Sequence, residues 1–155
     1  MEPNEPKALL WRGSSKTGYM TFPVEVQREM GYALFLAERK TAMKRTSAAK
    51  DAKRNVWLQL GFPDAEEHYL KAELVLRLDK AIKALGLTQR VAARRIGTTQ
   101  PELSKILGGK FSEVSFERLL RFLTALGHHI EIKIGAAEPK KTGNVTVTDA
   151  GRRAA

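Results

Sequence analysis

One segment of the sequence, residues 87–109, restricts the fold more than any other. Thr88 is a residue type favoured just before a helix, and the apolar spacing that follows predicts a short helix over residues 89–96. Gly97 can then adopt the positive φ of a tight turn. The side chains that this first helix would bury are Ala92, Ala93 and Ile96.

A second short helix is predicted directly after this turn. Thr99 and Glu102 have the spacing of a capping box, and Pro101 suits a first helical turn. The side chains that it would bury are Leu103, Ile106 and Leu107. Two helices that cross over a short turn need a small residue where they touch, and Ala93 supplies it. The spacing predicts a helix-turn-helix; the alternative is two consecutive core helices joined by a glycine turn.

Helices on both sides are predicted to complete a bundle. Asp64 and Glu67 form another capping-box pattern, and Gly86 ends the helix that follows. The apolar face of that helix is Leu70, Leu74, Val75, Leu78, Ile82 and Leu85. Ser115 opens a later helix that ends before Gly127. Its apolar stripe is Phe116, Leu119, Leu120, Leu123 and Leu126.

Residues 128–134 alternate between polar and apolar side chains, a pattern typical of a β-strand. The apolar face consists of Ile130, Ile132 and Ile134. A lone strand leaves its backbone groups unpaired, so we expect a partner strand. The partner is either the same strand of a second copy across a two-fold axis, which makes a homodimer, or residues 8–12 or 145–148 of the same chain.

The beginning of the chain predicts a smaller, separate segment. Residues 1–7 are expected to be disordered, residues 8–12 to form a short strand and residues 13–18 a loop. A helix is predicted to begin at Phe22-Pro23, because proline suits the first helical position. The apolar positions of that helix are Val26, Met30, Ala33, Leu34 and Ala37.

Two stretches of low apolar content flank the bundle. Residues 41–54 are small, polar and basic, and are either a solvated linker or a basic arm that follows phosphates. Residues 39–54 hold seven basic side chains and one acidic one, whereas residues 86–121 hold seven and three. Residues 136–155 are predicted to form a flexible tail.

The whole chain of 155 residues has a net charge of +10, which favours a polyanionic partner without identifying it. It contains no Cys and three His, so we expect neither a metal site nor a cofactor. No signal-peptide pattern begins the chain, and no apolar run nears the ~18 residues of a membrane-spanning helix. We therefore expect a soluble cytoplasmic protein that does not bind membranes.

The second half of the chain carries a family resemblance. The residues that carry it are Leu87-Thr-Gln89, Ala93, Ile96-Gly97, Gln100-Pro101, Leu103-Ser104, Gly109-Lys110-Phe111, Ser115-x-Glu117-Arg118-Leu-Leu120 and Leu123-x-x-Leu126-Gly127, with the closing strand. With these residues the domain at 55–135 resembles the antitoxins of the HigA/XRE group, whose DNA-binding domain is of the phage Cro-repressor class. The resemblance implies a small helical bundle that dimerises, binds an operator and often neutralises a cognate toxin.

A second resemblance lies near the start of the chain. Its residues are Leu9-Leu-Trp-Arg-Gly-Ser-Ser-Lys16, Phe22-Pro-x-Glu-Val26 and Glu29-Met-Gly-Tyr-Ala-Leu34. They are similar to a strand and helix of HigB/RelE-like, phage-type toxins, which cleave RNA on the ribosome. The later strands, which carry the catalytic residues in that fold, have no counterpart here. This resemblance implies a truncated toxin-like segment over residues 8–40 that is not an enzyme.

Exposed residues of the helix-turn-helix are the candidate DNA contacts. Its second helix enters the major groove with its N-terminal residues at the base edges, where Gln100 can pair with adenine N6 and N7. Gln89 is expected to hold a phosphate and Lys110 to meet the backbone. The full candidate set is Gln89, Gln100, Pro101, Ser104, Lys105 and Lys110, with Arg90 and Arg94 as further phosphate candidates.

The sequence therefore predicts a mainly α protein, a small helical bundle with a helix-turn-helix and a C-terminal β-strand, preceded by a short strand-helix fragment and a basic linker. Its predicted function is sequence-specific binding to a palindromic operator in double-stranded DNA, as an antitoxin that represses its own toxin–antitoxin operon. The alternative is an interaction protein that masks a RelE/HigB-like toxin, with Val56-Trp57-Leu58-Leu60 and the helix after Asp64 as a contact surface. The interpretation that we favour for Trp57 is that it packs on that helix. An RNA-cleaving enzyme on residues 8–40 would lack an acid–base set that includes His.

Overall fold

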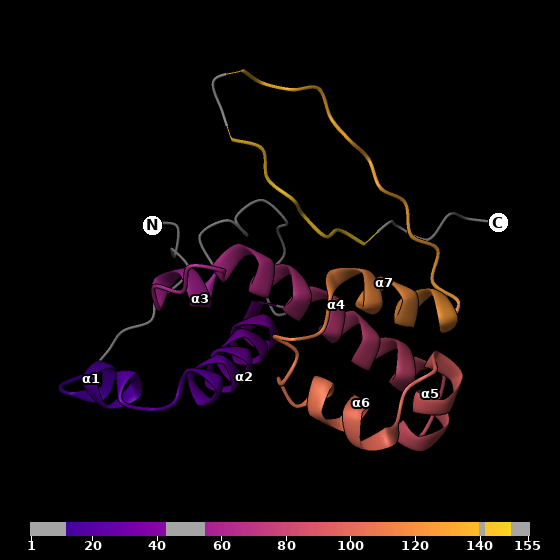
Figure 1. Ribbon diagram of the computed structural model, residues 1–155, viewed down its shortest axis with the longest axis horizontal. Helices are drawn as coiled ribbons and strands as arrows, with labels where there is room; N and C mark the ends of the chain where they lie inside the picture. The colour runs from indigo at the N-terminus through magenta and orange to yellow at the C-terminus, as the bar shows by residue number, and fades with distance from the viewer. Residues whose placement is uncertain (1–11, 43–54, 140–141, 150–155) are drawn as a thin grey trace.

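The computed structural model describes residues 12–42, 55–139 and 142–149 (Figure 1). Over these ranges the chain forms seven helices and no β-strand. The helices are α1 (Ser15–Met20), α2 (Val24–Ala42), α3 (Val56–Gln59), α4 (Ala65–Ala84), α5 (Gln89–Ile96), α6 (Gln100–Leu107) and α7 (Phe116–Ala125). The mainly helical class predicted from the sequence is confirmed.

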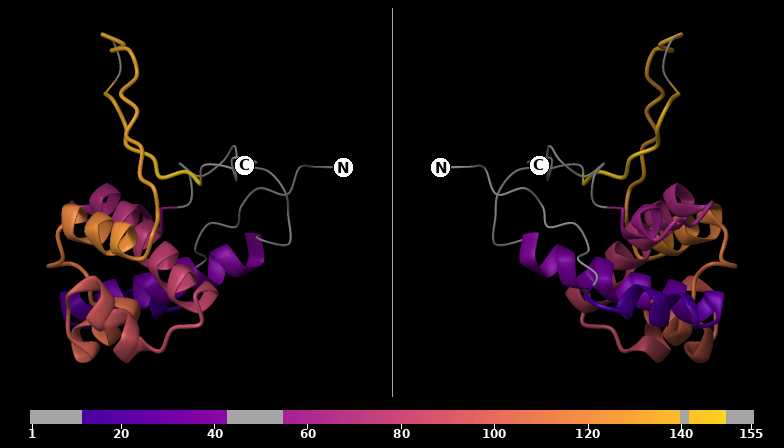
Figure 2. Two further views of the ribbon diagram at one scale, coloured as in Figure 1. Left: turned by 90° about the vertical axis from the view of Figure 1, so that its right-hand side faces the viewer. Right: turned by 90° about the vertical axis from the view of Figure 1, so that its left-hand side faces the viewer.

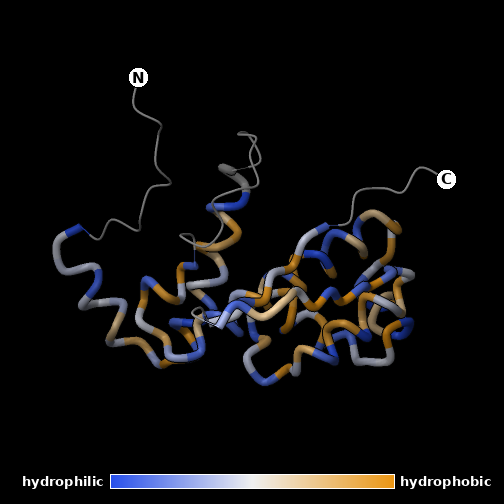
Figure 3. The backbone as a smooth tube through the Cα atoms, turned by 90° about the horizontal axis from the view of Figure 1, so that it is seen from above, coloured by the Kyte–Doolittle hydropathy of each residue, from blue (hydrophilic) through white to orange (hydrophobic). Residues whose placement is uncertain are grey.

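The central element is α4, which packs against α3, α6 and α7, while α5 packs against α6 and α7. Hydrophobic and hydrophilic residues alternate in short stretches along the helices (Figure 3), as expected when each helix buries one face. The predicted core positions of α4 from Leu74 to Ile82 are buried, whereas Leu85 is exposed because it lies past the end of the helix. In the three views of Figures 1 and 2, α5 and α6 lie on one side of the bundle, and residues 128–139 and 142–149 lie on the other.

The face that α2 turns to the core differs from the predicted one. Tyr32 and Phe35 are 3% and 2% exposed, whereas Val26 and Met30 are 37% and 39% exposed. Aromatic side chains remove more apolar area from water than Val, Met or Ala does. The helix therefore turns its aromatic face inward and leaves four of the five predicted positions exposed, while the fifth, Leu34, packs against the core.

An aromatic cluster joins α2 to the rest of the bundle. The ring of Phe35 lies 5.7 Å from that of Trp57, and the ring of Tyr32 lies 5.1 Å from that of Phe111. Gly31 makes this approach possible, because a Cβ at that position would lie 2.6 Å from Nε1 of Trp57. The two segments on either side of residues 43–54 thus share one hydrophobic core.

The segment before α2 is more ordered than the sequence predicts. The loop predicted over residues 13–18 is partly helical, since α1 begins at Ser15. The hydroxyl of Tyr19 donates to the carbonyl of Gln27 at 2.7 Å, and Gln27 Nε2 donates to the carbonyl of Phe22 at 2.8 Å. These two hydrogen bonds fix the corner between α1 and α2, a long-range arrangement that a turn-forming sequence does not reveal.

Several predicted elements fall partly or wholly outside the described residues. The disordered segment 1–7 and nearly all of the strand at 8–12 lie there, as do residues 43–54 of the predicted linker 41–54. The first two residues of that linker are the last two of α2, so the helix is longer than predicted.

The apolar residues after position 55 form a helix, α3. The side-chain oxygen of Asn55 accepts hydrogen bonds from the backbone N–H groups of Trp57 and Leu58, which caps the helix, and its Nδ2 donates to the carbonyl of Ala65 at 2.9 Å. Val56 and Trp57 are fully buried, while Leu58 is exposed. The favoured interpretation, that Trp57 packs on the helix after Asp64, is confirmed by its ring contact with His68 of α4. The alternative toxin surface on these apolar residues is wrong for most of them, because α2 and α4 cover them.

The predicted capping box at the start of α4 does not form. Asp64 makes no side-chain cap to the helix. Its Oδ2 instead accepts a hydrogen bond of 2.9 Å from Nη2 of Arg28 on α2. A carboxylate paired with a guanidinium in this way no longer serves the helix N-terminus.

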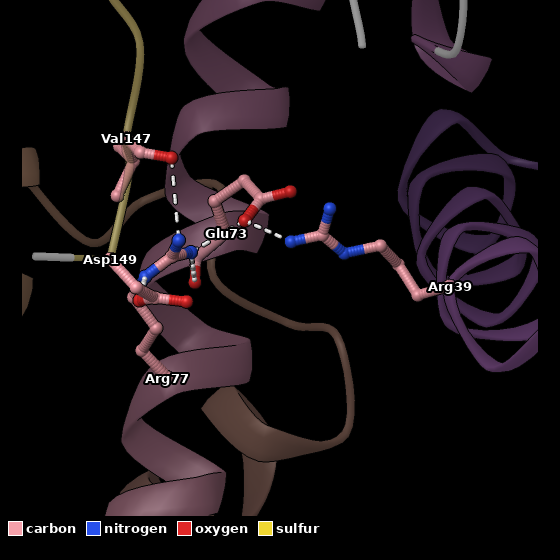
Figure 4. Close-up of polar contacts among 5 residues, drawn as sticks. All are labelled: Arg39, Glu73, Arg77, Val147 and Asp149. Atoms are coloured by element: carbon pink, nitrogen blue, oxygen red, sulfur yellow. Dashed lines mark hydrogen bonds and ion pairs between the residues drawn. The ribbon is translucent and has the colours of Figure 1, made fainter. Parts of the chain in front are cut away.

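A buried carboxylate, Glu73 on α4, joins three distant segments (Figure 4). Its Oε2 accepts from Nη2 of Arg39 at 2.6 Å and from Nη1 of Arg77 at 2.5 Å. Arg77 also donates to the carbonyl of Val147 at 3.3 Å and to Oδ1 of Asp149 at 2.8 Å. The part of the predicted flexible tail at 142–149 therefore returns to α4 and is bound there.

The predicted closing strand is not found. Residues 128–139 have no regular secondary structure, and Ile132 and Ile134 are 76% and 93% exposed. Of its two possible partners within the chain, residues 145–148 form no ladder with this segment, and residues 8–11 lie outside the described residues.

Candidate nucleic-acid interface

The two helices of the predicted helix-turn-helix have the predicted bounds and caps. Oγ1 of Thr88 accepts a hydrogen bond from the N–H of Val91, and Oγ1 of Thr99 accepts one from the N–H of Glu102. Between them Gly97 is left-handed, with φ 76° and ψ 36°. The turn chemistry of this segment is thus set by local sequence alone.

The interior of the motif is small and apolar, as predicted. Ala93 is buried where α5 meets α6, and its carbonyl accepts the N–H of Thr98. Leu103 and Ile106 of α6 are fully buried beside it. The small side chain in α5 lets α6 approach closely enough for its apolar side chains to fill the angle between the helices.

The outer side of the motif carries the predicted contacts. Four exposed residues lie along one side of α6 at positions i, i+1, i+4 and i+5. They are Gln100, Pro101, Ser104 and Lys105. On α5, the exposed candidates are Gln89, Arg90 and Arg94. The structure therefore places seven of the eight predicted residues on these two helices.

The first residues of the two helices touch each other. Nε2 of Gln100 donates a hydrogen bond of 3.1 Å to Oε1 of Gln89, at an exposed position. A primary amide carries two N–H groups and a carbonyl oxygen. Gln100 therefore keeps one N–H and its oxygen for a base edge, while Gln89 limits the directions in which they point.

Glu102 holds α6 to the neighbouring helix. Oε1 of Glu102 accepts from Nη1 of Arg118 on α7 at 2.7 Å, and Oε2 accepts a short hydrogen bond from the hydroxyl of Thr98. These donors, Arg118 first, lower the pKa of Glu102. The carboxylate does not complete the predicted capping box, because both of its oxygens are occupied by these partners.

A second link, which the sequence did not suggest, joins α5 to the end of α7. Nε of Arg95 donates to the carbonyl of Ala125 at 3.3 Å. A cation at a helix C-terminus is favourable, because carbonyl groups there lack partners. The two residues are 30 positions apart, so only the fold brings them together.

Lys110 is the one candidate beyond α6, and it has a partner within the chain. Its Nζ lies 3.3 Å from Oε1 of Glu29 on α2, and its side chain is exposed. The ion pair is accessible to solvent and is therefore weak. A phosphate that reaches Lys110 would compete with Glu29 for it.

The electrostatic balance of this surface is positive. Residues 86–112 include five basic side chains and a single acid, Glu102. Because Arg118 and Thr98 occupy that carboxylate, little negative charge remains to repel a phosphate backbone. The arrangement is a convex, cationic helical edge with hydrogen-bonding amides at its centre.

Comparison with known proteins agrees with this geometry. Residues 56–135, or 80 of the 155 residues, match the family model described as a helix-turn-helix domain. No curated protein and no solved structure gives a significant match to the chain. None of the helices that the structure describes is long and apolar enough to cross a membrane.

Proposed function

The chain belongs to the helix-turn-helix domain family, and from this membership we propose that it is a sequence-specific regulator that binds an operator and represses its own operon. The observation that carries the proposal is the exposed Gln100, which α6 presents next to Gln89 at the start of α5. In a helix-turn-helix, the start of the second helix is the part that reaches base edges.

Base recognition is assigned to α6. Gln100 donates its free N–H to adenine N7 and accepts from adenine N6 with its oxygen. Ser104 and Lys105, one turn further along the same side, meet the flanking base or phosphate. Pro101 is exposed beside them and adds apolar contact area.

Phosphate contacts are assigned to α5 and to the residue that follows α6. Gln89 stands at the N-terminus of α5, where backbone N–H groups also favour an anion. Arg90 and Arg94 lie one turn apart on the exposed side of α5, and Lys110 lies beyond the end of α6. These contacts give affinity and register without base specificity.

We also propose that the DNA-bound unit is a homodimer on a palindromic site. The closing segment 128–134 supports this, because Ile132 and Ile134 are exposed and its backbone lacks a strand partner within the described chain. Pairing of this segment with its copy across a two-fold axis would cover the isoleucines and give the backbone groups hydrogen-bond partners. Ile132→Glu should then lower the mass of the assembly in solution; an unchanged mass would contradict pairing through this segment.

The test of DNA binding is footprinting on the promoter of the protein's own gene. The expected result is protection of a palindrome whose half-sites are about one helical turn apart. The matched control is Gln100→Ala, which should lose the footprint at protein concentrations where non-specific DNA is still bound. Uniform protection of any sequence by the unaltered protein would contradict sequence-specific recognition.

The antitoxin role is a further part of the proposal and rests on the resemblance of residues 55–134. The expected partner is a RelE/HigB-like toxin encoded next to this chain, in the cytoplasm, and the test is co-expression followed by co-purification. Since α2 covers Trp57, the toxin would contact a surface other than the buried side of α3. Binding of the operator without binding of that toxin would leave a repressor that is not an antitoxin.

For α1 and α2 we propose a structural role and no catalysis. They pack on the helix-turn-helix domain through Tyr32 and Phe35, which leaves these aromatic groups unavailable to a substrate. A ribosome-dependent RNA cleavage assay should give no product.

A further inference from the structure

The outer side of α2 carries an apolar stripe that the bundle does not use. It consists of Val26, Met30, Ala33 and Ala37, and all four residues are exposed. At about 100° per residue, the stripe lies roughly opposite the buried positions Gly31 and Phe35. These are four of the five positions that the sequence predicts as the core face; the fifth, Leu34, packs against the core.

The spacing of this stripe is that of a helix-pairing seam. Successive members are four, three and four residues apart, which is the alternation of a and d positions in a heptad repeat. Helices with this spacing bury the seam against a second helix. In the described part of the chain these four residues stay exposed, while Phe35 on the opposite side of α2 packs against Trp57 of α3 and Tyr69 of α4.

The stripe is also self-complementary in size. Its first two members are the larger Val26 and Met30, and its last two are the smaller Ala33 and Ala37. If two copies lie antiparallel, Val26 of each copy faces Ala37 of the other at the two ends of the seam. Met30 of each copy then faces Ala33 of the other on either side of its centre. Large side chains then meet small ones in every layer, which is the condition for close packing.

We propose that a second copy of this chain covers the seam, with the two α2 helices antiparallel around a two-fold axis between Met30 and Ala33. Such an interface is isologous, since each copy contributes the same surface. The proposal goes beyond operator binding, because it assigns to the toxin-like segment an assembly function of its own. It requires no residue of α5 or α6.

The seam is held rigidly, so little ordering is needed when two copies meet. Arg28 pairs with Asp64 near one end of α2, and Arg39 pairs with the buried Glu73 near the other. Between them, Phe35 fixes the rotation of the helix about its axis. A preformed helix forfeits less conformational entropy on association than one that folds on binding.

The first test compares two charge substitutions on α2 by sedimentation velocity. Met30→Glu puts a carboxylate into the seam of both copies and should halve the mass of the assembly. The matched control Val24→Glu changes an exposed apolar residue on the other side of the same helix and should leave the mass unchanged. An unchanged mass for Met30→Glu, or a monomeric unaltered protein at 100 μM, would overturn the proposal.

The second test fixes the orientation and does not depend on the stability of a charged variant. The chain has no cysteine, so engineered ones give a clean background. A mixture of Val26→Cys and Ala37→Cys chains should form a disulfide-linked dimer under mild oxidation, because these positions face each other. Each variant alone should remain uncrosslinked; crosslinking of Val26→Cys with itself, or none in the mixture, would overturn the antiparallel seam.

Two further variants separate this proposal from the others. Ile132→Glu alters only the closing segment, so it should leave the Val26–Ala37 crosslink intact. The Met30→Glu variant should still bind the operator in a gel shift, since α5 and α6 are unchanged. Loss of DNA binding with an intact crosslink would contradict the proposed function and leave the proposed α2 interface standing. Loss of the crosslink with intact DNA binding would contradict only the α2 interface.

Discussion

Gln100 donates a hydrogen bond of 3.1 Å to Gln89, and this bond connects the first residue of α6 with the first residue of α5. The two residues are eleven positions apart and meet because the left-handed Gly97 reverses the chain between the helices. A glutamine amide that is held on one side has fewer orientations to lose when it pairs with a base. The pair therefore gives the proposed recognition residue a preset direction.

The first prediction concerns this residue. Gln100→Ala should weaken binding to the preferred operator by roughly 1–3 kcal/mol, because a bidentate contact to adenine is lost. Binding to random DNA should change little, since phosphate contacts remain. Gel-shift titrations on both DNAs measure the difference, and an equal loss on both would remove Gln100 from base recognition. Gln89→Ala should lower operator affinity less, because it frees Gln100 without removing it.

The second prediction concerns the ion pair between Lys110 and Glu29. Lys110→Ala should lower affinity on every sequence and reduce the slope of log K against log salt by about 1. Glu29→Gln should act in the opposite direction on affinity, because it releases Lys110 for a phosphate. Glu25→Gln on the same helix changes the net charge equally and serves as its control. Equal effects of the two glutamine variants would show that only net charge matters.

The third prediction tests the approach of α2 to α3. Gly31→Ala places a Cβ where Nε1 of the fully buried Trp57 now lies, 2.6 Å away, so the helix or the indole must move. Overpacking of this kind destabilises a core by about 1–3 kcal/mol, which exceeds the gain in helix propensity. Urea unfolding should therefore show a lower midpoint. Gly18→Ala in α1, where a Cβ meets nothing within 4 Å, should be neutral or slightly stabilising.

The fourth prediction concerns pH. His68 is 2% exposed, between the rings of Trp57 and Phe111 at 4.7 and 4.8 Å. Burial, then the charge of Arg28, lowers the pKa of His68 from 6.5 to about 4, while Asp64 and Glu67 oppose this and Lys71 adds to it. The unfolded chain thus binds a proton at a pH where the folded chain does not. The contribution of neutral His68 to the free energy of unfolding is fully present above about pH 6.5. It falls as the pH drops towards 4, by roughly 3 kcal/mol over that interval.

Thermal unfolding between pH 7 and pH 4 measures this effect. His68→Leu removes the titrating group and should flatten the dependence over this range. His128→Ala, at an exposed position, should keep it. A further loss at lower pH is expected from Glu102, because a carboxyl whose pKa is lowered by Arg118 and Thr98 contributes stability only while it is ionised. A slope that is equal in all three proteins would contradict the assignment to His68.

Local sequence was sufficient for the helix-turn-helix. Thr88, Gly97 and Thr99 act on backbone groups within a few residues, so their roles can be predicted without knowledge of the fold. The same holds for Ser115, which caps α7 through the N–H of Arg118. The candidate DNA contacts follow from the apolar spacing within these helices, because that spacing determines which side of each helix is buried and which is left exposed.

The parts that sequence reasoning missed depend on partners far along the chain. The rotation of α2 was wrong because two apolar stripes compete on that helix, and only the position of Trp57 in space decides which is buried. The capping box at Asp64 failed because Arg28, 36 residues earlier, takes the carboxylate. The closing strand does not form in the described residues, so its pairing with a second chain stays a prediction.

The pairing of Glu73 with two arginines also restricts which substitutions this sequence can tolerate. One carboxylate pairs with both Arg39 and Arg77, so a mutation that neutralises Glu73 removes this counter-ion from Arg39 and leaves Arg77 only the exposed Asp149. Conversely, loss of Arg39 alone removes half of the charge that compensates a buried carboxylate. Across descendants of this chain that keep α2, positions 39, 73 and 77 should therefore change together or remain as they are, which would make this trio an ancestral signature of the joined segments.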